Sequence, residues 1–124
     1  MVTPDIHYKL MNLNQDKVPI NLEEALTLLK EAMTDVEKDA LKGMKSSDLH
    51  FSLGTYLRNE WSLWQSGDIL PLWFLTTYGV KHADDISGII LECLVNDVEG
   101  KPRRDKEVAK QFLAHWKKQS DEQP

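Results

Sequence analysis

The spacing of apolar residues is the feature that most constrains the fold of this 124-residue chain. Along most of the sequence these residues recur three and four positions apart instead of alternating. Such spacing gathers apolar side chains on one side of an α-helix, whereas a half-buried strand requires alternation. Leucine also outnumbers the β-branched apolar residues, with 17 Leu against 13 Ile and Val together, which favours helices. We therefore predict an all-α protein.

Six helical segments are predicted from capping residues followed by an apolar stripe. Asn21 and Thr34 each precede a glutamate three residues later, an arrangement that satisfies the free N–H groups of a first helical turn. The other four segments begin near Ser46, Asp68, His82 and Asp105. The segment after Asp68 is apolar nearly all round, so we expect it to be the central helix of the core.

The length and composition of the chain indicate one domain with a single hydrophobic core. We expect a compact helical domain over residues 21–118, a flexible N-terminal arm over residues 1–20 and a polar C-terminal tail over residues 119–124. Cys93 is the only cysteine, so a disulfide framework is excluded. The longest apolar stretch, residues 69–75, is far shorter than the about 20 residues that cross a bilayer. Residues 1–10 lack the pattern of a secretory signal, and we expect a cytoplasmic protein without a membrane partner.

Two stretches carry more specific motifs: residues 57–64, Leu-Arg-Asn-Glu-Trp-Ser-Leu-Trp, and residues 82–91, His-Ala-Asp-Asp-Ile-Ser-Gly-Ile-Ile-Leu. They resemble a bacterial family, number 6794 among the domains of unknown function, with patterns like Phe-x-Leu-Gly-x-x-Ile-Arg-Asn-x-Trp-x-Leu-Trp and His-Pro-Asp-Asp-Met-Ser-x-Ile-Ile-Leu. Ala83 replaces the family's usual proline. Residues 112–116 also resemble the closing amphipathic helix of the family, so the resemblance spans about residues 22–118. It implies no particular activity.

Arg58 and Asn59 stand among apolar neighbours, and a partly buried guanidinium requires an anionic or carbonyl partner. We expect a planar, two-pronged pairing of Arg58 with Asp84 or Asp85, which would fix one helix against another. The alternative is a ligand or anion site around Arg58, His82, Asp84 and Asp85. Trp64, at the end of its helix, is the aromatic residue most expected to be exposed.

Metal and nucleophile chemistry are poorly supported by the sequence. His82, Asp84 and Asp85 are metal-ligand types, but no second histidine lies three or four residues away on the same helix. A helix cap, with Asp85 returning to the backbone of His82, explains these residues and is favoured over a metal site. His50 and His115 could join them only through the fold. Cys93 lies on an apolar face, and Gly54 and Gly88 are expected at close helix contacts. We expect no cofactor, no metal and no enzymatic activity.

The charge of the chain is uneven. Residues 1–100 hold 8 basic and 16 acidic side chains, whereas residues 101–120 hold 7 and 2. The basic side chains of residues 101–120, which we call the basic set, lack a nucleic-acid recognition motif. The net charge of −5 also opposes binding to nucleic acid. The acidic side chains expected to face a basic partner are Glu23, Glu24, Glu31 and Asp35.

These observations predict a small, acidic interaction domain that binds another protein. The more specific hypothesis is an immunity-type inhibitor that neutralises a cognate toxin by covering its basic functional surface. The main alternative is an enzyme or small-ligand binder built on the cluster around Arg58 and His82. The oligomeric state is not indicated by the sequence.

Overall fold

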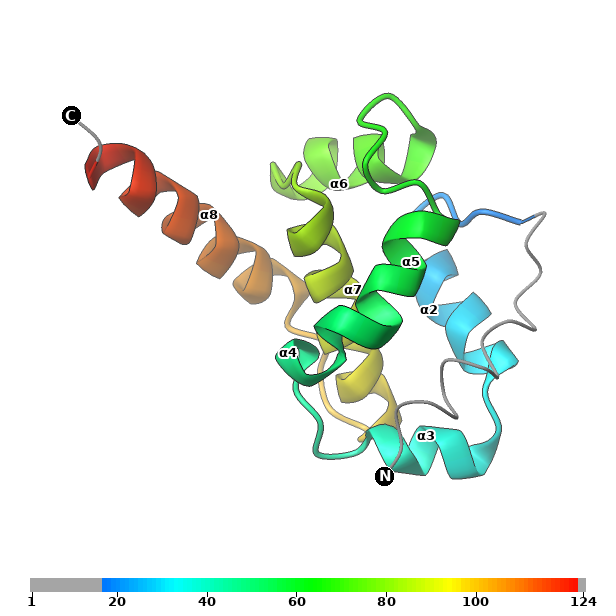
Figure 1. The fold of residues 1–124 in the computed structure, drawn as a ribbon. Coiled ribbons are helices and arrows are strands. Elements are labelled where there is room, and N and C mark those ends of the chain that lie inside the picture. Colours follow the sequence, from blue (N-terminus) through cyan, green and yellow to red (C-terminus); the bar gives the residue numbers. More distant parts are fainter. Residues whose placement is uncertain (1–16, 123–124) are drawn as a thin grey trace.

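The chain is helical throughout its regular structure over residues 17–122, the part that the computed structural model describes (Figure 1). α4, a π-helical turn η1 and α5 follow one another without a break, so six helical runs are present and the all-α prediction is confirmed. The elements are α2 (Leu22–Ala32), α3 (Asp35–Leu41), α4 (Ser46–Leu49), η1 (His50–Gly54), α5 (Thr55–Glu60), α6 (Ile69–Tyr78), α7 (Ala83–Val98) and α8 (Asp105–Glu122).

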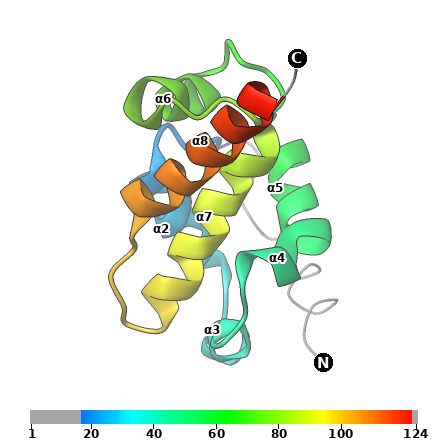
Figure 2. The same cartoon turned by 90° about the vertical axis from the view of Figure 1, so that its left-hand side faces the viewer.

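α7 is the central helix, and every other helical element of the described chain packs against it (Figures 1 and 2). Eleven of its 16 residues are buried. The prediction that α6 would be central is wrong, because only Leu70, Pro71 and Phe74 of α6 are buried. Small residues explain the difference. Ser87 and Gly88 let neighbouring elements approach α7 on sides where the bulky residues of α6 would keep them away.

Local capping agrees with the sequence at the first two helices. The Asn21 side chain accepts a hydrogen bond from the backbone N–H of Glu24 at 2.8 Å. Thr34 and Glu37 form the reciprocal pair of bonds predicted for α3, at 3.2 and 2.7 Å. α4 begins at Ser46, and the residue before it, Lys45, provides no side-chain cap. Instead, the Asp48 carboxylate accepts a hydrogen bond from the backbone N–H of Lys45. Capping therefore defines where each helix starts but not how the helices pack.

α8 lies outside the bundle formed by the other helices. In Figure 1 it runs outward from the body, and only Ala109 of its described side chains is fully buried. The helix continues to Glu122, so residues 119–122, expected in the polar tail, are helical. Residues 17–20 of the predicted arm are not helical, and residues 1–16 lie outside the described part. None of the helices described has the length and apolar character needed to cross a membrane.

Candidate functional site

The guanidinium of Arg58 is buried between α5 and α7, with 4% of the residue exposed. Its Nη1 donates to Ser87 Oγ at 2.9 Å. Its Nη2 donates to the carbonyl of His50 at 3.1 Å and to Thr55 Oγ1 at 3.0 Å. The π-helical turn η1 places the His50 carbonyl where Arg58 can reach it, eight residues along the chain. Neutral oxygens thus provide most of the partners of this cation.

Asp84 is the acidic partner of Arg58, but the pairing is weaker than predicted. Arg58 Nε lies 3.4 Å from Asp84 Oδ1, and this nitrogen makes no hydrogen bond within the described residues. The expected two-pronged fork is therefore not formed. The Asp84 side chain is 60% exposed, so its carboxylate remains open to solvent. Arg58 anchors α5 to α7 chiefly through Ser87 and the π-helical turn.

Asp85 faces α8 instead of Arg58. Its Oδ2 accepts a hydrogen bond from the indole N–H of Trp116 at 2.7 Å. The same indole stacks on the imidazole of His82, with ring centroids 4.1 Å apart. The prediction that Asp85 returns to the backbone of His82 is wrong, because its carboxylate bonds to Trp116 of α8 instead. Trp116 is a member of this cluster that the sequence did not reveal, since its role depends on how α8 docks.

Two glycines permit the close contacts predicted for them. A Cβ atom on Gly88 would lie 3.0 Å from the ring of Phe112 in α8. One on Gly54 would lie 2.9 Å from Arg58 Nη1 and 3.4 Å from the carbonyl of Leu49. Glycine at these two positions therefore makes room for α8 and for the guanidinium, respectively.

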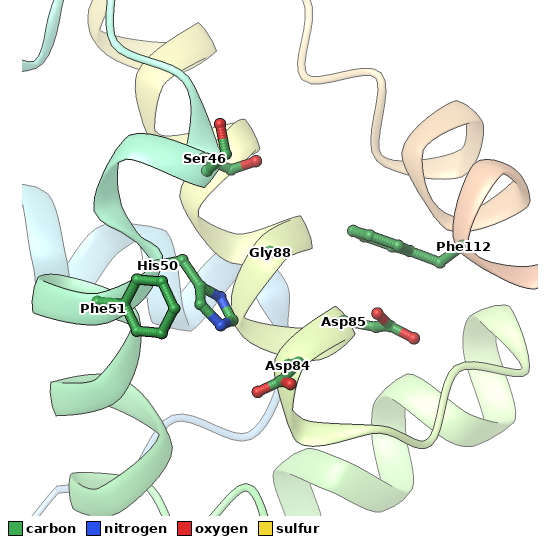
Figure 3. Close-up of a pocket in the computed structure, with 8 residues that line it drawn as sticks. Ser46, His50, Phe51, Asp84, Asp85, Gly88 and Phe112 are labelled. Carbon is green, nitrogen blue, oxygen red and sulfur yellow. The ribbon is translucent and has the colours of Figure 1, made fainter. Parts of the chain in front are cut away.

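Two clefts share the exposed Asp84 side chain, and we call them together the Asp84 surface. The first has a volume of about 330 Å³, and Figure 3 shows its lining residues drawn from α4, η1, α7 and α8. They are Ser46, Ser47, His50, Phe51, Asp84, Asp85, Gly88 and Phe112. The second, of about 310 Å³, is lined by Leu63, Trp64, Lys81, His82, Ala83, Asp84 and Trp116. Aromatic side chains of α8 thus contribute to both clefts.

One exposed aromatic residue stands beside each cleft. Phe51 is 86% exposed and Trp64 is 62% exposed. The sequence predicted an exposed Trp64, and the structure agrees. Leu49 and Leu53, two residues before and after Phe51, face the core, so Phe51 points outward. Asn59 is exposed next to this surface, and its Oδ1 accepts from the Trp64 indole at 3.4 Å.

The four acidic candidates lie on α2 and α3 and line neither cleft. Glu23 forms a two-pronged pair with Arg103, whose Nη atoms lie 3.2 and 2.9 Å from its carboxylate oxygens. That hydrogen bonding and the charge of Arg103 lower the pKa of Glu23. Glu31 and Asp35 are exposed, and Glu24 is half-buried. Only part of the predicted acidic face is therefore free to meet a partner.

Three of the seven basic side chains in residues 101–120 are paired within the fold. Arg103 also bonds Asp97, Arg104 pairs with Glu107, and Lys101 lies 3.1 Å from Glu99. These pairs reduce the positive field that residues 101–120 could present to phosphate groups. The thiol of Cys93 is buried, and burial together with the nearby Asp105 charge raises its pKa to about 12. Such a thiol remains protonated and poorly nucleophilic at neutral pH.

The comparisons with known proteins identify a family for this chain. The family model described as "Domain of unknown function (DUF6794)" matches residues 18–97. The chain belongs to this family. The match ends within the last turn of α7, so α8 lies beyond it, although the sequence resemblance was expected to reach residue 118. Neither the curated proteins nor the solved structures gave a match.

The DUF6794 domain, residues 18–97, carries most of the Asp84 surface, and α8 adds only Phe112 and Trp116 to it. Among the side chains that the structure describes, no three His, Cys, Asp or Glu residues are grouped to hold a metal ion. Arg58, His82 and Asp85 each have partners inside the protein. Asp84, Phe51 and Trp64 are 60%, 86% and 62% exposed, and Ser47 and Lys81 of the same surface are also exposed.

Proposed function

We propose that this DUF6794 protein binds another protein through its Asp84 surface. The observation that carries the proposal is the exposure of Phe51 and Trp64, at 86% and 62%, beside two clefts that share one carboxylate. Large aromatic side chains next to pockets are typical of the residues that dominate binding energy at protein interfaces. Exposed apolar groups with a polar rim also mark interaction surfaces.

The alternative of an enzyme or anion binder at Arg58, His82, Asp84 and Asp85 has less support. The two terminal guanidinium nitrogens of Arg58 donate to protein oxygens, which leaves little of this cation for a bound anion. Asp85 already accepts from Trp116, and the His82 ring is stacked. One exposed carboxylate does not provide the paired acid and base that most hydrolytic or proton-transfer reactions require.

The more specific form of the proposal is an immunity-type inhibitor that binds a toxin in the cytoplasm. Its support is the net charge of −5 and the exposed Glu31 and Asp35, which would attract a basic partner surface. Glu23 contributes less to this attraction because Arg103 already pairs with it. Nucleic acid is a poorer partner for the same reasons of charge.

The proposal is tested by capturing partners from an extract of the source organism with the intact chain. The same capture uses Phe51→Ala and Trp64→Ala variants, and Val36→Ala serves as the matched control because Val36 is 79% exposed on α3, away from both clefts. A captured protein is then purified, and its Kd is measured by isothermal titration calorimetry. We expect Phe51→Ala and Trp64→Ala each to raise the Kd about tenfold or more, and Val36→Ala to leave it unchanged.

A partner whose affinity is the same for all three variants would show that the Asp84 surface is not the binding surface. The inhibitor hypothesis needs a further result: expression of the partner alone must stop growth, and co-expression of this chain must restore it. Charge reversal at Glu31 and Asp35 should then slow association at low salt. A partner that is harmless when expressed alone would refute inhibition while leaving protein binding in place.

A further inference from the structure

A second candidate site lies between α6 and α8, away from the Asp84 surface. It is a groove of about 440 Å³, larger than either cleft of that surface. Trp73, Thr77 and Tyr78 form its α6 wall, and Ala109 and Leu113 form much of its α8 wall. Figure 2 shows the two helices that bound it near one end of the molecule.

The α6 side of the groove is free of charge. No Asp, Glu, Lys, Arg or His occurs from Ile69 to Val80, although charged residues make up 28% of the chain. Trp73 packs its ring edge-on against Tyr78, with centroids 5.5 Å apart, so this wall is a firm aromatic surface. Leu113, on the opposite wall, is 39% exposed. Water in the groove therefore contacts mainly apolar groups, and an apolar occupant would displace it favourably.

Two lysines stand on the α8 side of this apolar groove. Lys106 and Lys110 both line it and are one helical turn apart, so they lie on the same side of α8. Within residues 17–120, neither ammonium group has an ion-pair partner, whereas Lys101, Arg103 and Arg104 in the same basic stretch all do. The one carboxylate in the groove, Asp105, accepts a hydrogen bond from the Tyr78 hydroxyl at 2.5 Å. The rim thus offers two unpaired positive charges.

We propose that this groove binds a small amphiphilic anion, a molecule with an apolar chain or ring and one anionic head group. The apolar part would lie along Trp73, Tyr78 and Leu113, and the head group would pair with Lys106 and Lys110. A volume of about 440 Å³ lies within the range of about 300–1,000 Å³ typical of small-molecule sites. This site is independent of the protein-binding function proposed above, since it shares no residue with the Asp84 surface.

The close spacing of the two lysines favours a small molecule over a macromolecular partner. The two free ammonium groups are a single helical turn apart on α8, which suits one head group better than an extended acidic surface. The aromatic wall behind them matches a short apolar chain.

The test uses decanoate, below its micelle concentration, with the full chain and isothermal titration calorimetry. We expect one saturable site, and the indole N–H resonance of Trp73 should shift in an NMR titration. Replacing both groove lysines, Lys106→Gln with Lys110→Gln, should raise the Kd about fivefold or more, from the loss of two partly exposed ion pairs. Thr77→Trp, which fills the groove from its exposed edge, should weaken binding at least as much.

The control variant is Lys117→Gln with Lys118→Gln, which removes the same charge from the same helix outside the groove. It should keep the wild-type Kd. Decyltrimethylammonium, with the same chain and the opposite charge, should not bind. The lysines and Thr77 are exposed, so all variants should keep the wild-type circular dichroism spectrum and Tm.

Three results would overturn the proposal. The first is equal affinity of the Lys106/Lys110 and Lys117/Lys118 variants for decanoate. The second is equal binding of decanoate and decyltrimethylammonium, which would indicate apolar adsorption alone. The third is sedimentation of the protein with phosphatidylglycerol vesicles without binding to free decanoate, which would assign the lysines to a membrane surface.

Discussion

The two ends of α7 are fixed to the rest of the molecule by different kinds of polar contact. At its N-terminal end, the buried Arg58 cation bonds to the neutral oxygens of Ser87, His50 and Thr55. At its C-terminal end, Asp97 accepts from Lys30 at 2.9 Å and from Arg103 at 2.9 and 3.1 Å, close to the surface. Arg103 extends this network to Glu23 on α2.

The two ends of α7 differ in how well water can replace a polar contact that is lost. Arg58 is 4% exposed, and Ser87, which accepts from its Nη1, is fully buried. The Asp97 side chain is 10% exposed, but those of Lys30 and Arg103 are 32% and 30% exposed, so water can solvate these two cations when a pair is broken. Removal of a buried donor leaves buried acceptors unsatisfied, whereas exposed ion pairs contribute little net free energy. The first end should therefore control stability, and the second should control its dependence on salt and pH.

Arg58→Ala should have the largest effect. It removes three hydrogen bonds and leaves a cavity between α5 and α7, so we expect the free energy of unfolding to fall by about 3 kcal/mol or more. Urea unfolding followed by circular dichroism measures this change. Lys101→Ala is the control at the other end of α7, because its ammonium is mostly exposed and its removal should cost less than about 0.5 kcal/mol. Equal losses for the two variants would contradict the contrast between the ends.

Gly54→Ala tests whether the Arg58 guanidinium needs the space that glycine leaves at position 54. Alanine is better than glycine in a helix by about 0.5–1 kcal/mol, but here its Cβ would lie 2.9 Å from Arg58 Nη1. We expect a net loss of about 1–2 kcal/mol because the guanidinium must shift from its bonds. Gly67→Ala, in the turn before α6, is the control for an added Cβ that meets no atom within 4 Å.

A double-mutant cycle separates the guanidinium from other neighbours of Gly54. If the clash with Arg58 causes the loss, Gly54→Ala should cost little in the Arg58→Ala background. An unchanged cost in that background would mean that the carbonyl of Leu49 or the Cδ1 atom of Leu91, each 3.4 Å from the added Cβ, sets the limit instead.

The predictable parts of this structure are those that depend on neighbours in the sequence. The caps at Asn21 and Thr34 and the six helical runs follow from hydrogen bonds that span three or four residues. The exposure of Trp64 follows from its position where a helix ends. Even the approach of Arg58 to Asp84 could be predicted, because a buried cation among apolar residues requires an anion or carbonyl nearby.

The parts that could not be predicted depend on how helices dock. Trp116 reaches Asp85 across 31 residues, and no local pattern indicates that contact. The choice of α7 over α6 as the central helix depends on the shapes of neighbouring surfaces and not on apolar content, which is high in both. The clefts on either side of Asp84, and the groove beside α6, likewise arise from the placement of α8.

Arg103→Gln tests the opposite end of α7, with a smaller effect. It removes the charge that joins Asp97 to Glu23, and we expect the free energy of unfolding to fall by about 1 kcal/mol at low salt. That loss should shrink as NaCl is raised from 0.05 to about 1 M, since salt screens exposed pairs. The loss caused by Arg58→Ala should change little over the same range, because buried contacts are screened less. A salt-independent loss at Arg103 would mean that its contribution is packing.

Asp97→Asn should have the smallest effect of these variants, and its difference from the wild type should be present at neutral pH and disappear as the pH falls. Burial raises the pKa of Asp97, but the hydrogen bonds from Arg103 and Lys30 outweigh it and lower the pKa below its ordinary value. A carboxyl group whose pKa is lowered by folding stabilises the folded state at pH values above its unfolded pKa, about 3.9. That contribution is lost as the pH falls through the lower, folded pKa. Unfolding free energies measured between pH 6 and pH 2.5 should therefore fall less steeply for Asp97→Asn than for the wild type, by about 1 kcal/mol or less over the whole range.

Arg103→Gln should also make the free energy of unfolding fall less steeply in acid, because it removes one of the donors that lower the pKa of Asp97. Should Asp97→Asn keep the full wild-type slope, the acid sensitivity would belong to other carboxylates with lowered pKa values, such as Glu99, which accepts from the backbone of Gly43.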